Sequence, residues 1–132
     1  MVPLPQALAL TLCERIIVEE GTRNLTLVST FLSRRVVSFP SEPVVFSVIV
    51  PLVGGSGTGT IELAVVRLQT DETIYSQQGT ISFPDRLLVV NAQFRVSKLR
   101  FPASGFYSFM TLIDGELIAQ RRLRVYQGDH TP

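Results

Sequence analysis

The sequence predicts an all-β protein, folded as a single-domain antiparallel β-sandwich of about seven or eight strands. Short apolar runs, many alternating with polar residues, recur along most of the 132 residues and are separated by Gly, Pro, Asp and Asn. No stretch of a dozen residues has the 3.6-residue period and the capping residues of a helix. The pair Asp114-Gly115 lies between two strand-like runs and predicts a hairpin, because both turn residues must accept positive φ. A closed β-barrel is the alternative architecture.

The first half of the chain contains a leader and three predicted strands. Residues 1–6 include Pro3 and Pro5, which lack the N–H donor of a strand ladder, so we expect a leader here and the sandwich domain over residues 7–126. The predicted strands cover about Ala7 to Cys13, with a continuation as far as Val18, then Asn24 to Leu32 and Val44 to Leu52. The last of these strands is apolar on both faces, which is typical of a central strand that is covered on both sides.

The second half begins with a glycine-rich segment, Gly54 to Gly59, which predicts a flexible hairpin tip. In the next strand the alternation slips between Val65 and Val66, which indicates a β-bulge or burial on both faces. The predicted strands cover Ile61 to Leu68, Thr73 to Gln77, Ile81 to Phe83 after a kink at Gly79, Leu87 to Val96, Gly105 to Ile113 and Glu116 to Tyr126.

The run from Leu87 to Val96 alternates more cleanly than any other. The side chains expected to face the core are Leu88, Val90, Ala92, Phe94 and Val96. Residues 127–132 are polar, and we expect them to form a flexible tail.

Composition argues against several classes of protein. The net charge of +1 gives no electrostatic case for binding nucleic acid or a membrane surface. Cys13 is the single cysteine, so a disulfide framework within the chain is excluded and nothing indicates an oxidising compartment. The apolar run before Cys13 has no basic region ahead of it and is too short to span a bilayer. We therefore expect a cytoplasmic protein.

Residues that could perform chemistry are few and scattered. Cys13 and His130 are the only cysteine and histidine; one falls in an apolar strand and the other is third from the chain end, which favours a structural role for Cys13. Two such ligands are too few for zinc, and the four aspartates lack the spacing of a calcium site. A strand follows Gly54 to Gly59, whereas a phosphate-binding loop precedes a helix. We expect no catalytic residue, metal or cofactor; an enzyme with an unrecognised site is a remote alternative.

Three features together resemble a known group of sequences. They are the segment Cys13 to Gly21, the Phe-Pro pairs, and an ending in which Pro102 to Phe109 is followed by Asp114-Gly115-Glu116. This pattern is similar to a family of small, uncharacterised bacterial proteins of unknown function. The ending also resembles the last two strands of immunoglobulin-like sandwiches, although the core tryptophan and the cysteine pair of antibody domains are missing. The resemblance implies an immunoglobulin-like fold and brings no catalytic residues.

Apolar residues on the outward side of the last hairpin suggest an interaction surface. If Tyr107 and Phe109 fill the core, their neighbours fall on the opposite face, which is normally polar in a sandwich. The residues expected at the interface are Phe106, Met110, Leu112, Arg122, Arg124 and Tyr126. We expect a homo-oligomer or a complex with another protein through this face. The alternative is a small-ligand or carbohydrate module that uses loops near Tyr75 or Tyr126.

Overall fold

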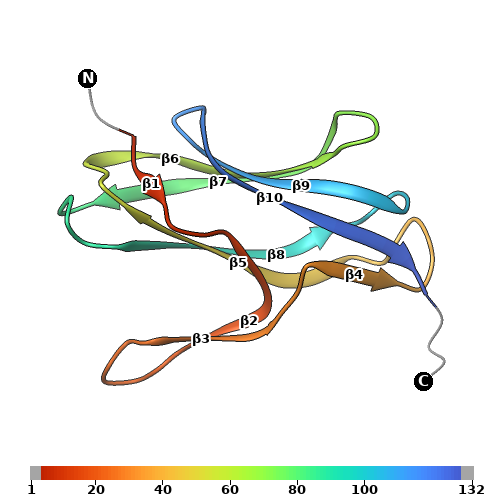
Figure 1. Ribbon diagram of the computed structural model, residues 1–132, viewed down its shortest axis with the longest axis horizontal. Helices are drawn as coiled ribbons and strands as arrows, with labels where there is room; N and C mark the ends of the chain where they lie inside the picture. Colours follow the sequence, from red (N-terminus) through yellow and green to blue (C-terminus); the bar gives the residue numbers. More distant parts are fainter. Residues whose placement is uncertain (1–3, 129–132) are drawn as a thin grey trace.

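The computed structural model describes residues 4–128, which form ten strands in two sheets of five strands each. Figure 1 shows the two sheets stacked as layers, with the chain crossing repeatedly between them. The strands are β1 (Gln6–Ala7), β2 (Thr11–Val18), β3 (Leu25–Thr30), β4 (Ser33–Val36), β5 (Val44–Val53), β6 (Gly57–Arg67), β7 (Glu72–Phe83), β8 (Val90–Leu99), β9 (Gly105–Ile113) and β10 (Glu116–Gln127). Within this range no helix forms, so the predicted all-β class is confirmed.

Each sheet has a central strand and two edges. In sheet A, β5 pairs with β8 on one side and with β1 and β2 on the other, and β3 continues from β2. In sheet B the order is β4-β10-β9-β6-β7. All pairs are antiparallel except β4 with β10, which is parallel. In sheet A one edge is β8 and the other is formed by β3 and the two-residue β1; in sheet B the edges are β4 and β7.

The prediction of seven or eight strands was too low. Two of the ten strands are short: β1 has two residues and β4 has four. Strand β4 reads Ser-Arg-Arg-Val, so it lacks the apolar alternation that marks a strand, and it forms because β10 offers it a parallel edge. Strand β7 also runs through Gly79 without interruption, where a kink was expected.

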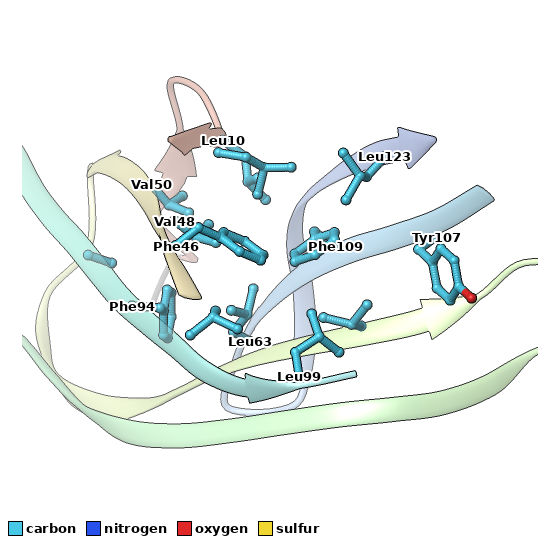
Figure 2. Packing of buried hydrophobic residues seen from close by; sticks show 14 of the residues in the cluster. Leu10, Phe46, Val48, Val50, Leu63, Phe94, Leu99, Tyr107, Phe109 and Leu123 are labelled. Atoms are coloured by element: carbon cyan, nitrogen blue, oxygen red, sulfur yellow. The ribbon is translucent and has the colours of Figure 1, made fainter. Parts of the chain in front are cut away.

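The core lies between the two sheets. It is formed by every second residue along the strands, whose side chain points inward. Figure 2 shows side chains from both sheets converging there, among them Phe46 of β5 and Phe109 of β9. The rings of these two residues, both fully buried, meet across the layers with centroids 5.7 Å apart. Phe46 also makes an edge-on contact with Phe31, at 5.3 Å. Aromatic contacts of this kind stabilise the sandwich beyond the area that they bury.

Local signals placed the last hairpin and one irregularity correctly. Asp114 and Gly115 both have positive φ, at 50° and 83°, as a two-residue hairpin turn requires. The pairing of β6 with β7 shifts register between Val65 and Val66, which confirms a bulge. The glycine-rich segment is shorter than predicted, because β6 already begins at Gly57 and only residues 54–56 remain outside the strands.

The predicted inward position of Leu88 is wrong. Strand β8 begins at Val90, and the backbone N–H of Leu88 donates instead to the carbonyl of Asp85, 3.2 Å away, in a turn. The turn ends the alternation, so Leu88 is 55% exposed while Ala92 and Phe94 are buried as expected. Leu87 and Val89 are exposed on the same turn.

A tyrosine ties the start of β9 to the connection before it. The hydroxyl of Tyr107 donates to the carbonyl oxygen of Ala103 at 2.6 Å and accepts from the N–H of the same residue at 3.4 Å. The Tyr107 side chain is fully buried and packs against Phe101, with ring centroids 4.9 Å apart. The long connection from β8 to β9 is thereby held against the core.

We expect Tyr107→Phe to lower the free energy of unfolding by about 1–2 kcal/mol, because the backbone of the half-buried Ala103 loses its hydrogen-bond partner while the ring stays in place. Urea denaturation followed by circular dichroism measures the change. Tyr126→Phe is the matched control, at a half-buried tyrosine on the outward side of sheet B, and should change stability by less than about 0.5 kcal/mol. Equal effects of the two substitutions would contradict the assigned role of the Tyr107 hydroxyl.

Thr111 is a polar residue in the apolar core. It is fully buried opposite Leu63 and Ala119, and within residues 4–128 its Oγ1 atom has no hydrogen-bond partner. Thr111→Val replaces the hydroxyl by a methyl group of similar size, so we expect stability to rise by about 1 kcal/mol. The same urea titration tests this, with Thr26→Val on the exposed side of β3 as control. A destabilised Thr111→Val variant would show that the hydroxyl is in fact satisfied.

Candidate interaction surface

The six predicted interface residues all lie on β9 and β10, the two neighbouring central strands of sheet B. In β9, Phe106, Met110 and Leu112 alternate with the buried residues Tyr107, Phe109 and Ile113, so they point away from the core. Arg124 of β10 is directly opposite Phe106. The structure therefore brings the predicted residues together on one surface, which we call the outer face of sheet B.

The apolar part of this face is only partly covered. Phe106 is 48% exposed, and Met110 and Leu112 are half-buried. Leu117 of β10 is opposite Leu112 and is 47% exposed, so it extends the apolar area although the sequence did not single it out. Leu117 could not be recognised from the sequence, because the β9–β10 register shifts between Leu117 and Ala119 and this shift breaks the alternation of inward and outward residues.

Small side chains occupy the middle of the outer face of sheet B. Ala64 of β6 is paired with Met110, and Val66 of β6 is paired with Ser108 of β9. Both Ala64 and Ser108 are buried, because small side chains here lie below their larger neighbours. The result is a broad sheet surface with apolar groups at its centre.

Two arginines stand over aromatic rings at the margin of the face. The guanidinium carbon of Arg122 is 5.8 Å from the ring centroid of Phe106, and that of Arg124 is 4.8 Å from that of Tyr126. Such cation–π contacts hold long side chains in place without removing their hydrogen-bond donors. Aromatic rings combined with arginine are enriched at protein interfaces.

The middle of the outer face of sheet A is covered by polar groups of the same chain. Arg95 of β8 reaches across β5, and its Nη1 atom donates to Ser47 Oγ at 2.8 Å and to the Glu14 carbonyl at 2.9 Å. Near this arginine, Cys13, Ser47 and Ile49 are all buried. The two-sided burial expected for the strand after Pro43 therefore holds at Ile49 and fails at Val45, which is 46% exposed.

The residues considered for chemistry are not brought into a site. The Cys13 side chain is fully buried, and burial, reinforced by the Glu14 carboxylate, raises the pKa of its thiol. His130 lies outside the described residues. Among residues 4–128 there is no group of three His, Cys, Asp or Glu side chains that could hold a metal ion. Tyr75 and Tyr126, considered for a ligand, lie on β7 and β10 with two strands between them.

Comparison with known proteins identifies the family. A family model described as a family of unknown function, DUF6941, matches residues 8–126. The chain belongs to this family. The matched region runs from the residue after β1 almost to the end of β10, so it covers strands of both sheets and the outer face of sheet B in this chain. The resemblance to an uncharacterised family is confirmed. No curated protein matches the chain.

Within residues 4–128, no helix has the length and the apolar character that crossing a lipid bilayer requires.

We expect the thiol of Cys13 to be unreactive in the folded protein. A buried thiol with a raised pKa is held in its protonated form, and the thiolate is the reactive form. Labelling with a thiol-specific reagent at pH 8 should be at least about tenfold slower in buffer than in concentrated guanidinium chloride. Rapid labelling in buffer would contradict the closed environment of Cys13 and would reopen its candidacy as a nucleophile.

Proposed function

We propose that this chain is a non-catalytic protein-interaction module that self-associates through the outer face of sheet B. The observation that carries the proposal is the composition of this face: Phe106 and Leu117 are exposed and Leu112 is partly exposed, beside arginines stacked on aromatic rings. An apolar sheet surface with an arginine-bearing margin is suited to burial against protein, because the centre gains from desolvation and the margin supplies hydrogen bonds.

The same proposal includes an immunoglobulin-like fold. In support, β4 runs parallel to β10 at one end of sheet B, and the order β10-β9-β6-β7 stacks on a sheet containing β2, β5 and β8. Immunoglobulin-like domains have a tyrosine near the start of the penultimate strand whose hydroxyl bonds back to upstream backbone, as Tyr107 does with Ala103. The Phe46–Phe109 contact joins the two sheets where antibody domains have a disulfide. Bacterial origin and cytoplasmic location belong to this proposal and rest on the family resemblance and the single cysteine.

The test of the outer face is Leu112→Glu, measured by light scattering after size exclusion. A carboxylate at the centre of an apolar contact must be desolvated without a partner, so we expect self-association to weaken at least about tenfold and the mass to fall below that of the wild type. Val18→Glu is the control, because Val18 is an apolar strand residue that is more exposed than Leu112 and lies on the β2–β3 hairpin of sheet A. Circular dichroism establishes that both variants are folded.

A Leu112→Glu mass equal to that of the wild type would show that the outer face of sheet B is not a contact between copies. A mass that falls equally in Val18→Glu would show a general effect of added charge.

A further inference from the structure

Three of the four sheet edges carry features that block pairing with another strand. Strand β4 is four residues long and contains Arg34 and Arg35. Strand β8 contains Arg95 and Lys98, and β3 contains Ser29 with a φ of 54°, which interrupts its extended edge. Shortness, charge and irregularity are the usual means by which an edge avoids addition of a further strand.

The fourth edge, β7, has the opposite character. It is twelve residues long, and from Thr73 to Phe83 it contains no charged residue and no proline. Within residues 4–128, β7 pairs only with β6, so the backbone donors and acceptors of its other side have no strand partner. An extended edge of this kind is a template for another strand.

Gly79 leaves a hole at the middle of this edge. It lies on the core side of β7, opposite Ile61, and a Cβ atom there would meet nothing within 4 Å. A groove of about 360 Å³ opens here between β7 and β8. Its floor includes the buried residues Ile61, Ile81, Ala92 and Phe94, and its rim includes the exposed residues Gln78, Thr80, Asn91 and Gln93. The missing side chain thus exposes an apolar floor beside an unpaired backbone.

Exposed apolar residues lie at both ends of β7. Leu68, on the turn that precedes the strand, is 37% exposed. On the turn that follows, Leu87 is 86%, Leu88 is 55% and Val89 is 51% exposed. If β7 pairs antiparallel with β7 of a second copy, the turn before β7 in each copy lies beside the turn after β7 in the other. The exposed apolar residues of the two turns would then shield one another from water.

We propose that β7 pairs antiparallel with β7 of a second copy, with Gln77 on the two-fold axis. This register overlaps nearly the whole strand, since Gln77 is at its centre. Residues whose numbers add to 154 then face each other, which places Tyr75 of each copy opposite Gly79 of the other. Tyr75 points to the core side, as Gly79 does, so the aromatic ring can cover the hole. No like charges are opposed between Thr73 and Phe83.

This edge contact is separate from the outer face of sheet B and does not depend on it. Both contacts are symmetric, so a chain that uses both assembles beyond a dimer. Light scattering then distinguishes the two. Leu112→Glu should leave a dimer held by β7, and the double variant Ser76→Lys/Gln78→Lys should leave a dimer held by the outer face. Combining all three substitutions should leave a folded monomer.

The lysine variant places like charges opposite each other in the proposed pair. Ser76 and Gln78 are exposed, point away from the core and face each other across the two-fold axis. The Glu62 carboxylate accepts a hydrogen bond from Ser76, so one lysine has an ion-pair partner and the fold should tolerate the change. The variant Ser76→Glu/Gln78→Glu should also lose the edge contact, and circular dichroism checks that it folds, because both new carboxylates lie beside Glu62. Mixing the two variants should restore it, because opposite charges then face each other across the axis.

Cross-linking tests the register. Gln77→Cys places two thiols on the axis, so mild oxidation should give a covalent dimer in high yield, with native Cys13 buried and silent. Asn91→Cys on the β8 edge is the control and should not cross-link.

A monomeric Leu112→Glu variant, or a lysine variant with the mass of the wild type, overturns the edge pairing. A Leu112→Glu variant with the mass of the wild type overturns the outer-face contact instead. Failure of the mixed charge variants to associate, or equal cross-linking of the two cysteine variants, contradicts the proposed register.

Discussion

The alternation of side chains along a strand is the constraint on which this structure depends. Successive residues point to opposite faces, and the sandwich has one core between its two sheets, so half of all strand positions face outward whatever their polarity. The two sheets meet this condition in different ways. On sheet A, Arg95 closes over Ser47 and the neighbouring Ile49 is buried, whereas Val45 and Ile17 stay exposed. On sheet B, Phe106 and Leu117 stay exposed beside arginines that stack on aromatic rings. The two faces therefore differ in the groups that surround their exposed apolar residues.

Backbone hydrogen bonding imposes a second condition, at the edges. An open sheet always ends in strands with one unpaired side, and the remedies in this chain are distributed unevenly. Strands β4 and β8 carry arginine, whereas β7, the longest edge, has no charged residue from Thr73 to Phe83 and contains a glycine near its centre. Gly79 has no side chain to cover Ile61, so at this point β7 lacks both a backbone partner on its outer side and side-chain cover over the core. One additional strand would supply both.

The features that could be predicted from the sequence are those set by neighbouring residues. Asp114-Gly115 accepts positive φ in itself, and the slip between Val65 and Val66 is a local break in alternation. Strand β4 could not be predicted in this way, because its only reason to form is the distant edge of β10. The outward residues of β9 followed from alternation alone. The stacking of Arg122 on Phe106 and the apolar pair Leu117–Leu112 did not, since both depend on the register between strands.

The neutrality of β7 is informative because a charge there would be easy to accommodate. Gln78 is exposed and lies directly opposite Glu62 on β6. A lysine at position 78 would face that carboxylate across the ladder, a pairing worth a few tenths of a kcal/mol, and would also protect the edge. Such a lysine would stabilise a monomer and would also protect its edge from pairing with another strand. The chain has Gln78 instead, flanked by Gln77 and Gly79. These uncharged residues favour pairing of the second edge of β7 with another strand.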